Sequence, residues 1–263
     1  MSTQQSGSAA APARSSLYLY AFGEADLTLP QGITGLNDSP LSLLSVDSVT
    51  AVVSPIASGR LRPERRHLAA HQGVLAKIMT TTTVLPVTFG MVVPSAGKLK
   101  RMLTPEIDSL VEQLDAVRGR VEMAIRLTWD VPNIFQYFVE QEPALRAARD
   151  TMLAQEGNHH AKVAAGELFG KIIATRRHEH ELQLLSIIEA AADEIQIEPP
   201  KSDSEILRVA ALVARDNLGA FEAKLNEAAD IFDSACRFDY SGPWAPHSFV
   251  SLRISAEQTA EAA

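Results

Sequence analysis

The sequence predicts an α+β protein built from two domains. Apolar and polar residues alternate over residues 120–128 and 206–215, which indicates strands with one buried face. Between these runs lie segments whose apolar residues recur every three or four positions, as in amphipathic helices. The chain has 263 residues, of which 46% are hydrophobic, so it can form two cores of ordinary size. We place the boundary near Gly119.

Residues 17–118 are expected to form an N-terminal α+β domain with a small mixed sheet and helices. The first strand is apolar on both faces and is therefore expected to be central. Asp47 and Ser48 separate two further runs and predict a tight hairpin. The predicted strands are 17–22, 41–46, 49–55 and 80–88.

Two helices are predicted in this half. The first spans 64–79, because its apolar positions and one histidine recur at helical spacing. The residues of this stripe are Leu68, His71, Leu75 and Ile78. The second helix follows Thr104-Pro105, with Thr104 as N-cap, and ends at Gly119.

Residues 119–254 are expected to form a C-terminal domain. Its predicted strands are 120–128, 194–198, 206–215 and 235–240, with helical segments at 132–192 and 217–232. This order, βαββαβ, is that of a ferredoxin-like sheet with helices on one face. The chain ends, 1–16 and 255–263, are rich in small and polar residues and are expected to be flexible tails.

Charge is unevenly distributed along the chain. Residues 1–118 carry ten Lys and Arg against nine Asp and Glu, whereas residues 119–263 carry 14 against 23, a net charge of −9. Such an acidic half argues against nucleic acid as a partner, since phosphates require a basic surface. The apolar runs are too short for a membrane span. Cys236 is the only cysteine, which excludes an intramolecular disulfide and fits a reducing cytoplasm.

The histidines do not predict a metal centre. His178 and His180 flank Glu179, but two positions apart on a helix their side chains point about 200° apart. His180 falls on an apolar stripe and is expected to be structural, and His160 is expected to be solvated at a helix start. No phosphate-binding glycine loop and no nucleophile elbow occurs in the sequence. We therefore expect no metal, no cofactor and no catalytic residue.

A rigid aromatic segment follows the last predicted strand. Gly242 and Pro243 are expected to end that strand, and Pro243 and Pro246 each fix a backbone φ angle and remove a donor. Trp244 would thereby be held on a stiff arm, with Phe249 just beyond. Large aromatic residues dominate the energetics of both cores and interfaces. Trp244 is therefore compatible with burial in the core of its own domain and with a role as a binding anchor.

This segment resembles the end of a known family. Residues 242–249 are similar to the closing Gly-Pro-Trp-Pro-Pro-Tyr-Ser-Phe signature of the gas vesicle protein F/L family (GvpF/GvpL). Residues 83–90 resemble that family's Leu-Pro-x-x-Phe-Gly strand, and His71 matches a helical histidine that precedes it. Residues 17–23 resemble its opening Tyr-x-Tyr strand. These matches occur in the family's order along residues 17 to 254.

The resemblance implies a two-domain accessory protein of gas vesicle assembly, located in the cytoplasm and associated with the vesicle. Such a protein would bind the small hydrophobic shell subunit and other accessory proteins. We expect Trp244, Pro246 and Phe249, with an exposed edge of the C-terminal sheet, to form the binding surface. Ala245 and His247 depart from the family pattern, so no role is carried over to them.

Other residues of the matched motifs are expected to maintain the fold. These are His71, Pro86, Phe89, Gly90, Gly242 and Pro243. For His71, both a hydrogen-bonded anchor between helix and strand and an ordinary core histidine predict loss of stability on truncation.

Two other classes of function remain open from the residues alone. The first is a small-molecule or metal-binding regulatory module, since ferredoxin-like domains carry many functions. The second is an enzyme that uses His71, or His178 with Glu179 or Glu181, as acid and base. The enzyme also requires a nucleophile or cofactor site, which the sequence does not offer.

Overall fold

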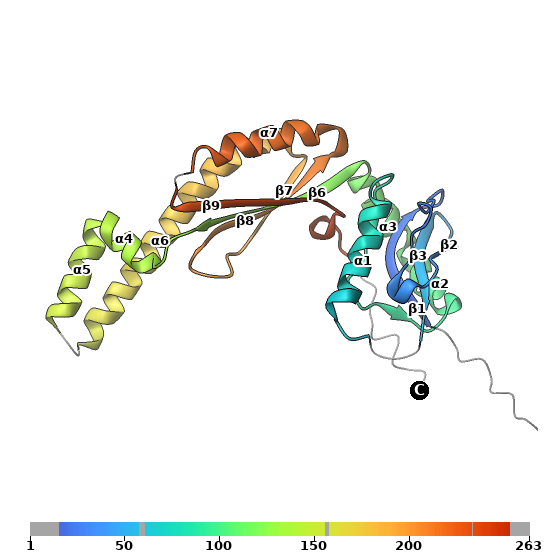
Figure 1. The fold of residues 1–263 in the computed structure, drawn as a ribbon, viewed down its shortest axis with the longest axis horizontal. Helices are drawn as coiled ribbons and strands as arrows, with labels where there is room; N and C mark the ends of the chain where they lie inside the picture. The colour runs from blue at the N-terminus through green and yellow to red at the C-terminus, as the bar shows by residue number, and fades with distance from the viewer. Residues whose placement is uncertain (1–15, 58–60, 156–157, 233, 253–263) are drawn as a thin grey trace, which may run out of the picture. The chain divides into compact units, whose positions relative to one another are not determined.

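The fold divides into two compact units. The computed structural model describes residues 16–57, 61–155, 158–232 and 234–252. Unit 1 contains the described residues up to Arg118 together with those from Ala245 onward, and unit 2 contains Gly119–Trp244. Each unit has its own antiparallel sheet accompanied by helices (Figure 1). The protein is therefore of the α+β class.

Strand β1 is the centre of the sheet in unit 1. All of its residues from Tyr18 to Phe22 are fully buried. β3 pairs with one side of β1, β4 and β5 pair with the other side, and β2 pairs with β3. The strands are β1 Ser16–Glu24, β2 Ser42–Val46, β3 Val49–Ile56, β4 Leu85–Pro86 and β5 Val92–Val93.

The expectation of a mixed sheet in this unit is wrong. β3 and β4 run in the same direction, but β1 lies between them and is antiparallel to both. Every strand pair among the described residues of unit 1 is consequently antiparallel. The predicted hairpin between β2 and β3 is confirmed, and Asp47 at its turn has a φ of 51°.

The helices of unit 1 are α1 Arg65–Ile78, α2 Ala96–Leu103 and α3 Ile107–Val117, with short turns η1 Leu36–Asp38, η2 Thr104–Glu106 and η5 His247–Phe249. Both α1 and α3 contact β1. Apolar residues of α3, such as Leu110 and Leu114, are buried, as their spacing predicts. They form part of the core beneath β1 because the helix presents one apolar face to the sheet.

The predicted strand 80–88 is shortened to Leu85–Pro86. Three threonines at its start bond to the last carbonyls of α1 instead of a neighbouring strand. The hydroxyl of Thr80 donates to the Lys77 carbonyl at 2.7 Å, and the hydroxyl of Thr81 donates to the Ile78 carbonyl at 3.2 Å. The backbone N–H of Thr82 also donates to the Ile78 carbonyl. Local side-chain bonds of this kind compete with strand pairing, so β-branched composition alone misleads here.

Two details of the predicted helices also differ from the structure. On α1, Leu68 is 40% exposed and His67 is buried instead, so the apolar stripe is rotated by one position. Thr104 caps the C-terminus of α2, a helix that we did not predict, and does not cap the N-terminus of the following helix. Its hydroxyl donates to the Lys100 carbonyl at 2.9 Å.

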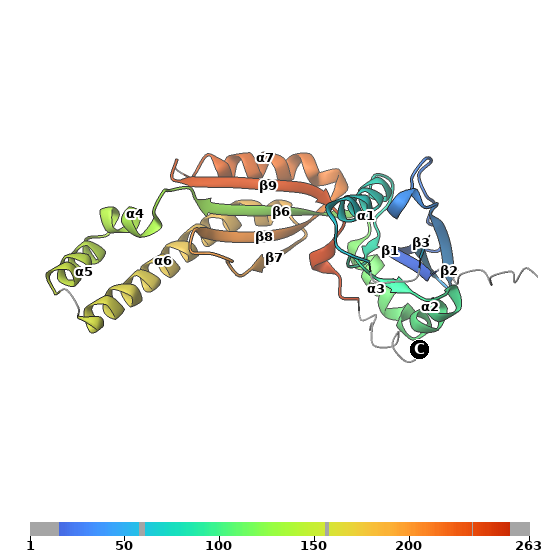
Figure 2. The same cartoon turned by 60° about the horizontal axis from the view of Figure 1, so that its bottom comes forward.

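The sheet of unit 2 has four antiparallel strands in the order β7-β8-β6-β9. Its strands are β6 Arg120–Trp129, β7 Glu194–Glu198, β8 Glu205–Ala214 and β9 Cys236–Trp244. The helices are α4 Ile134–Gln141, α5 Pro143–Ala154, α6 His159–Ile188 and α7 Leu218–Ala229, with turns η3 Glu189–Ala191 and η4 Arg215–Asn217. α6 and α7 lie along one face of this sheet (Figure 2).

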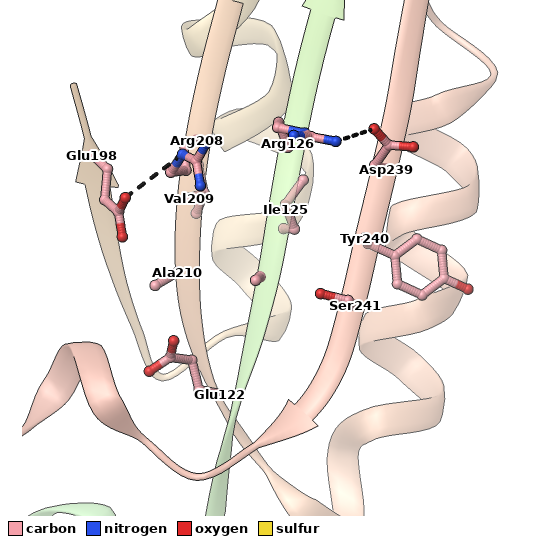
Figure 3. A pocket seen from close by; sticks show the side chains of 11 residues that line it. Glu122, Ile125, Arg126, Glu198, Arg208, Val209, Ala210, Asp239, Tyr240 and Ser241 are labelled. Atoms are coloured by element: carbon pink, nitrogen blue, oxygen red, sulfur yellow. Dashed lines mark hydrogen bonds and ion pairs between the residues drawn. The ribbon is translucent and has the colours of Figure 1, made fainter. Parts of the chain in front are cut away.

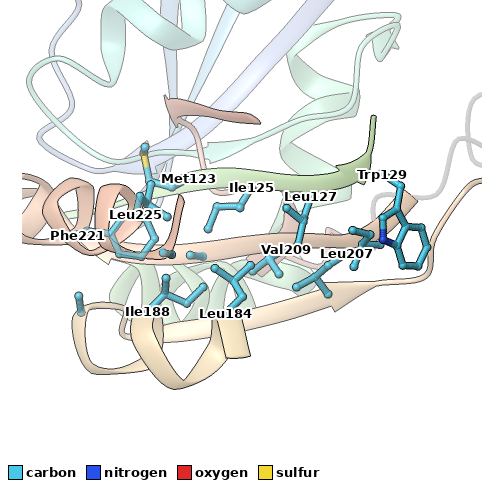
Figure 4. Packing of buried hydrophobic residues seen from close by; sticks show 14 of the residues in the cluster. Met123, Ile125, Leu127, Trp129, Leu184, Ile188, Leu207, Val209, Phe221 and Leu225 are labelled. Atoms are coloured by element: carbon cyan, nitrogen blue, oxygen red, sulfur yellow. The ribbon is translucent and has the colours of Figure 1, made fainter. Parts of the chain in front are cut away.

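The core of unit 2 lies between this face and the two helices (Figure 4). Alternate residues of β6 point into it, as the sequence pattern predicts, and Trp129 at the end of β6 extends the series. α7 contributes Phe221 and Leu225, and α6 contributes Leu184 and Ile188. All four helix side chains are fully buried.

α6 extends beyond the sheet and forms a hairpin with α5 (Figure 1). Asparagines begin two of the helices in this region. The side chain of Asn133 accepts from the Gln136 N–H, and that of Asn158 accepts from the N–H groups of His160 and Ala161. His160 therefore lies exposed in the first turn of α6, as expected.

The last strand does not end at the Gly-Pro pair as predicted. β9 continues through Gly242 and Pro243 to Trp244, which pairs with Glu122 across a bulge in the register. Pro243 is tolerated because β9 is an edge strand. Gly242 has a φ of 144°, and a Cβ added there would lie 2.6 Å from the Met123 sulfur and 2.9 Å from the Glu122 carbonyl oxygen. Only glycine fits at this position.

The residues from Ala245 belong to unit 1, whereas we expected 119–254 to form one domain. Ala245 and Pro246 are buried. The backbone N–H of Ser251 donates to the side-chain oxygen of Gln113 on α3 at 2.7 Å. This bond joins residues 138 positions apart along the chain, which local sequence patterns do not reveal. The expected tails, 1–16 and 255–263, lie outside the described residues except for Ser16.

Candidate functional site

A buried histidine links three segments of unit 1. The Tyr18 hydroxyl on β1 lies 2.9 Å from Nδ1 of His71 on α1, and it accepts a hydrogen bond from the Gly90 N–H at 3.1 Å. Because the Tyr18 oxygen accepts from Gly90, its own hydrogen is available to donate to Nδ1. This arrangement favours the neutral imidazole with its proton on Nε2.

Burial lowers the pKa of His71 from 6.5 to about 4, and the nearby His247 adds to this shift. An opposing, smaller effect comes from the Val87 backbone. Burial also raises the pKa of Tyr18 well above its ordinary value. His71 is therefore neutral at physiological pH and serves as a hydrogen-bond acceptor rather than a charged group.

Aromatic rings surround His71 on the side of the sheet. Tyr20 stacks on the imidazole with ring centroids 5.7 Å apart, and Phe89 meets it edge-on at 5.8 Å. Tyr20 is itself fixed, because its hydroxyl accepts from the Leu36 N–H at 2.8 Å. Pro86 pairs with Ala21 on β1.

The structure thus brings His71, Pro86, Phe89 and Gly90 together around β1. Gly90 has a φ of 98°, a conformation that strongly favours glycine. These four positions hold the 85–91 segment against the sheet and α1. His71, the titratable member of the four, is 1% exposed.

The residues expected to bind a partner are divided between the two units. Trp244 ends β9 in unit 2 and is 41% exposed, and its indole N–H donates to the Ser241 hydroxyl at 3.2 Å. Pro246 is buried and Phe249 is half-buried, and both belong to unit 1. Of the three, Trp244 has the most exposed side chain.

The face of the unit 2 sheet opposite α6 and α7 carries a charged row and a hollow of about 450 Å³ (Figure 3). Strand register places four charged residues side by side across the sheet, in the order Glu198, Arg208, Arg126 and Asp239. Arg126 donates to Asp239 at 3.0 Å, and Arg208 lies 3.7 Å from Glu198. Small residues form the floor of the adjacent hollow: Ala124, Ala210 and Ser241.

A buried carboxylate on β8, Glu205, supports Arg208 within this row. Arg208 donates to Glu205 at 2.6 Å, and the Lys201 N–H donates to its other oxygen at 2.6 Å. Burial alone would raise the pKa of Glu205, but these two bonds together with the charges of Arg208 and Arg126 hold the pKa below its ordinary value. The charges of the row are thus compensated by ion pairs within the sheet.

A second hollow in unit 2 was not foreseen from the sequence. It is lined by aromatic residues of α4, α6, β6 and the chain between α7 and β9. His180 lies there between Trp129 and Phe232, with ring centroids 6.3 and 5.5 Å away, while His178 points to solvent near Glu181. Within the described ranges, no group of three His, Cys, Asp or Glu residues could hold a metal ion.

Comparison with known proteins decides the family. A family model for gas vesicle synthesis protein GvpL/GvpF matches residues 16–251. The chain belongs to the GvpL/GvpF family. The opening strand, the 83–90 segment and the 242–249 segment all lie within the matched range, so the resemblance found in the sequence is confirmed.

Relatives of both F and L type are similar to this GvpL/GvpF chain over most of its length. Gas vesicle protein F of Streptomyces sp. is 27% identical and is matched over 89% of this chain and 99% of its own. Gas vesicle protein L of the same organism is 25% identical and is matched over 89% of this chain and 92% of its own. Gas vesicle protein F of Microcystis aeruginosa is 24% identical, over 89% and 98%.

Solved structures agree in fold. The crystal structure of GvpF from Anabaena sp. superimposes with a TM-score of 0.79 at 24% identity, covering 90% of this chain and 99% of that one. The GvpF structure from Microcystis aeruginosa gives the same values. In the part of the GvpL/GvpF chain that the structure describes, no helix is both long and apolar enough to cross a membrane.

Proposed function

We propose that this protein is an accessory factor of gas vesicle assembly that binds the hydrophobic shell subunit and other accessory proteins. The observation that carries this proposal is the family match along residues 16–251. The protein acts in the cytoplasm on the growing vesicle and catalyses no reaction. Its physical task is to cover apolar surface on a subunit that would otherwise self-associate.

We also infer that unit 2 is a ferredoxin-like module. Numbered within the unit, its strands have the spatial order 2-3-1-4 and are all antiparallel. The helices α6 and α7 follow the first and third of these strands, as the βαββαβ pattern requires.

The edge of this sheet formed by β9 is the proposed contact with the shell subunit. Among the described residues no strand pairs with the outer side of β9, so its backbone can accept an added strand. Two large side chains on β9 are exposed, Tyr240 at 45% and Trp244 at 41%. They are suited to act as anchors for an apolar partner. Pro246 and Phe249 would hold the chain that follows.

A co-expression pull-down with the shell subunit tests this contact. We expect the wild-type protein to retain the subunit in soluble form and Trp244→Ala to lose at least about tenfold of the captured amount, because an aromatic hot spot contributes about 2 kcal/mol or more. The matched control is Ile197→Ala, which removes a 46% exposed side chain from the opposite edge strand β7.

Circular dichroism establishes that each variant is folded before capture is compared. Capture by folded Trp244→Ala that equals capture by wild type would exclude the β9 edge. No capture by folded wild-type protein would argue against shell-subunit binding altogether.

The hollow of about 450 Å³ on the open sheet face favours one alternative, a module that binds a small polar molecule. Arg126 and Arg208 would offer donors to a ligand that lies on the floor of small residues. If shell-subunit capture fails, ligand screening by thermal shift with an Arg126→Met control tests this alternative.

A further inference from the structure

A bond at the start of β9 fixes which of its backbone groups face the free edge of the unit 2 sheet. The Asp130 N–H donates to the Ala235 carbonyl at 2.7 Å, so these two residues form a hydrogen-bonded pair in the register of β6 and β9. Hydrogen-bonded and non-bonded pairs alternate along an antiparallel ladder. Phe238 and Tyr240 therefore belong to non-bonded pairs, and their backbone N–H and C=O groups point away from β6 towards the free edge.

The two faces of this edge differ in chemistry. Phe238 and Tyr240 oppose core residues of β6, so they lie on the face that carries α6 and α7. The Phe238 ring stacks there on Phe232, with centroids 6.2 Å apart. Arg237 and Asp239 alternate with them and lie on the open face, where Asp239 ends the charged row (Figure 3). A strand added to this edge therefore needs apolar side chains on one face and polar side chains on the other.

The sequence of β9 itself meets this requirement. A second copy of β9 can lie antiparallel to the first, related to it by a two-fold axis that passes through Phe238 perpendicular to the sheet. Cys236 then opposes Tyr240 of the second copy, so the two apolar faces coincide. Arg237 opposes Asp239 of the second copy, and the same pair recurs on the other side of the axis. Each Arg–Asp pair occupies a non-bonded position, where antiparallel Cα atoms approach to about 4.5 Å.

Arg237 and Asp239 both keep hydrogen-bonding capacity for this pairing. Arg126 and Arg237 of the same chain bind the same carboxylate oxygen of Asp239, Oδ2, at 3.0 and 3.1 Å. The other oxygen, Oδ1, accepts no hydrogen bond from a residue that the structure describes. Arg237 donates through Nε, and its Nη1 atom is 3.7 Å from Asp130, so its terminal nitrogens can donate to a second chain. The charged row thus continues into the second copy with an opposite charge.

We propose that two copies of this protein pair through their β9 strands and join their unit 2 sheets into one continuous antiparallel sheet. The axis lies at Phe238, with Arg237 of each chain bound to Asp239 of the other. Self-pairing covers an edge that would otherwise be open to unspecific strand addition. The shell subunit is proposed to use the same edge, so dimerisation and capture exclude each other. This exclusion rests on the proposed function, whereas the dimer does not.

Sedimentation equilibrium of the full-length protein over a range of concentrations measures the dimer, and an exchange of charges tests its register. Arg237→Asp and Asp239→Arg each place like charges opposite one another at both pairs. Each variant alone should dimerise at least about tenfold more weakly than wild type. An equimolar mixture of the two variants places opposite charges at the same positions and should form heterodimers within about threefold of the wild-type affinity.

A matched control separates this edge from the other edge of the sheet. Glu194→Arg reverses an exposed charge on β7, the opposite edge strand, and should leave the dissociation constant of the dimer within about twofold. Circular dichroism establishes that every variant is folded. A monomeric wild type, dimers of unchanged affinity in both single variants, or a mixture of folded variants that does not recover would each overturn the proposal.

A disulfide at the axis tests whether the dimer excludes the shell subunit. The double variant Cys236→Ser, Phe238→Cys has its sole cysteine opposite that of the other chain, at a Cα separation of about 5.5 Å, which a disulfide spans. Mild oxidation should cross-link it but not wild type, whose two Cys236 residues lie about 13 Å apart along the strands. Absence of a cross-link in the folded variant would contradict the register.

Shell-subunit capture by this variant is then compared before and after reduction. The cross-linked dimer should capture at least about tenfold less than the reduced form, because its edge is occupied. Equal capture by both forms would refute the exclusion and leave the dimer standing. No capture by wild-type protein would instead contradict the proposed function, which the sedimentation results do not depend on.

Discussion

His71 shows how one buried titratable side chain can make stability depend on pH. Its imidazole is 1% exposed and accepts a hydrogen bond from Tyr18, so the charged form is disfavoured in the folded state. In the unfolded chain the same group regains an ordinary pKa of 6.5. Protons therefore bind preferentially to the unfolded state between these two values.

We expect the free energy of unfolding to fall by about 2 kcal/mol between about pH 7 and about pH 5 on account of His71. The folded-state pKa of about 4 lies below the unfolded value, so the contribution is fully present above pH 6.5 and is lost as the pH falls towards 4. Urea unfolding at each pH measures it. His71→Gln should remove this part of the pH dependence, whereas His178→Gln, at a solvent-exposed position, should retain it. An unchanged pH slope in His71→Gln would contradict this account.

At the scale of elements, the length of strand β9 depends on a single glycine. Gly242 combines a φ of 144° with backbone and sulfur atoms too close to admit a Cβ. Strand propensity predicts that β9 ends at Tyr240. Pairing continues to Trp244 because residue 242 has no Cβ that would collide with Met123 and Glu122.

Gly242→Ala should lower the free energy of unfolding of unit 2 by about 1–3 kcal/mol, because it forces a side chain into a backbone region that is almost confined to glycine. The control is Gly170→Ala in the middle of α6, where a new Cβ has no atom within 4 Å. That change should raise stability by about 0.5–1 kcal/mol through helix propensity. Thermal unfolding of both variants against wild type provides the measurement, and a neutral Gly242→Ala would show that strand β9 relaxes around the added Cβ.

Periodicity predicted the longer elements that present a single face to the core, but it missed the short helix α2. The inward-facing positions of β6 and the stripe of α3 are buried as predicted, whereas Glu122 on the other face of β6 is buried as well. Periodicity failed where side chains form specific local bonds, as when Thr80 and Thr81 bond the end of α1. The aromatic hollow was not predicted, because Trp129, Phe138 and Phe232 come from segments up to about a hundred positions apart. The His71 position was predicted, but not its bond to Tyr18.

At the scale of the whole molecule, the two units differ in whether their residues are continuous in sequence. Unit 2 is one continuous stretch, whereas unit 1 needs residues from both ends of the sequence. The residues from Ala245 supply buried positions and the bond from Ser251 to Gln113 on α3.

A chain that ends at Trp244 should therefore lose stability in unit 1 alone. Hydrogen exchange measured by mass spectrometry should increase in α3 and β1 and remain unchanged in β6 and β8, whose core is intact. A chain that ends at Leu252 retains these contacts and serves as control. Faster exchange in β6 and β8 of the shorter chain would show that the two units are not independent in stability.

The discontinuity of unit 1 sets an order of events during synthesis. Domains that are continuous in sequence can fold while translation proceeds, and the N-terminal one usually comes first. Here the sequence of unit 2 is complete before the last segment of unit 1 has been made. The N-terminal sheet therefore lacks its last segment until after the whole sequence of unit 2 has been made. The part of the polypeptide that is made first is thus the last to have all of its segments.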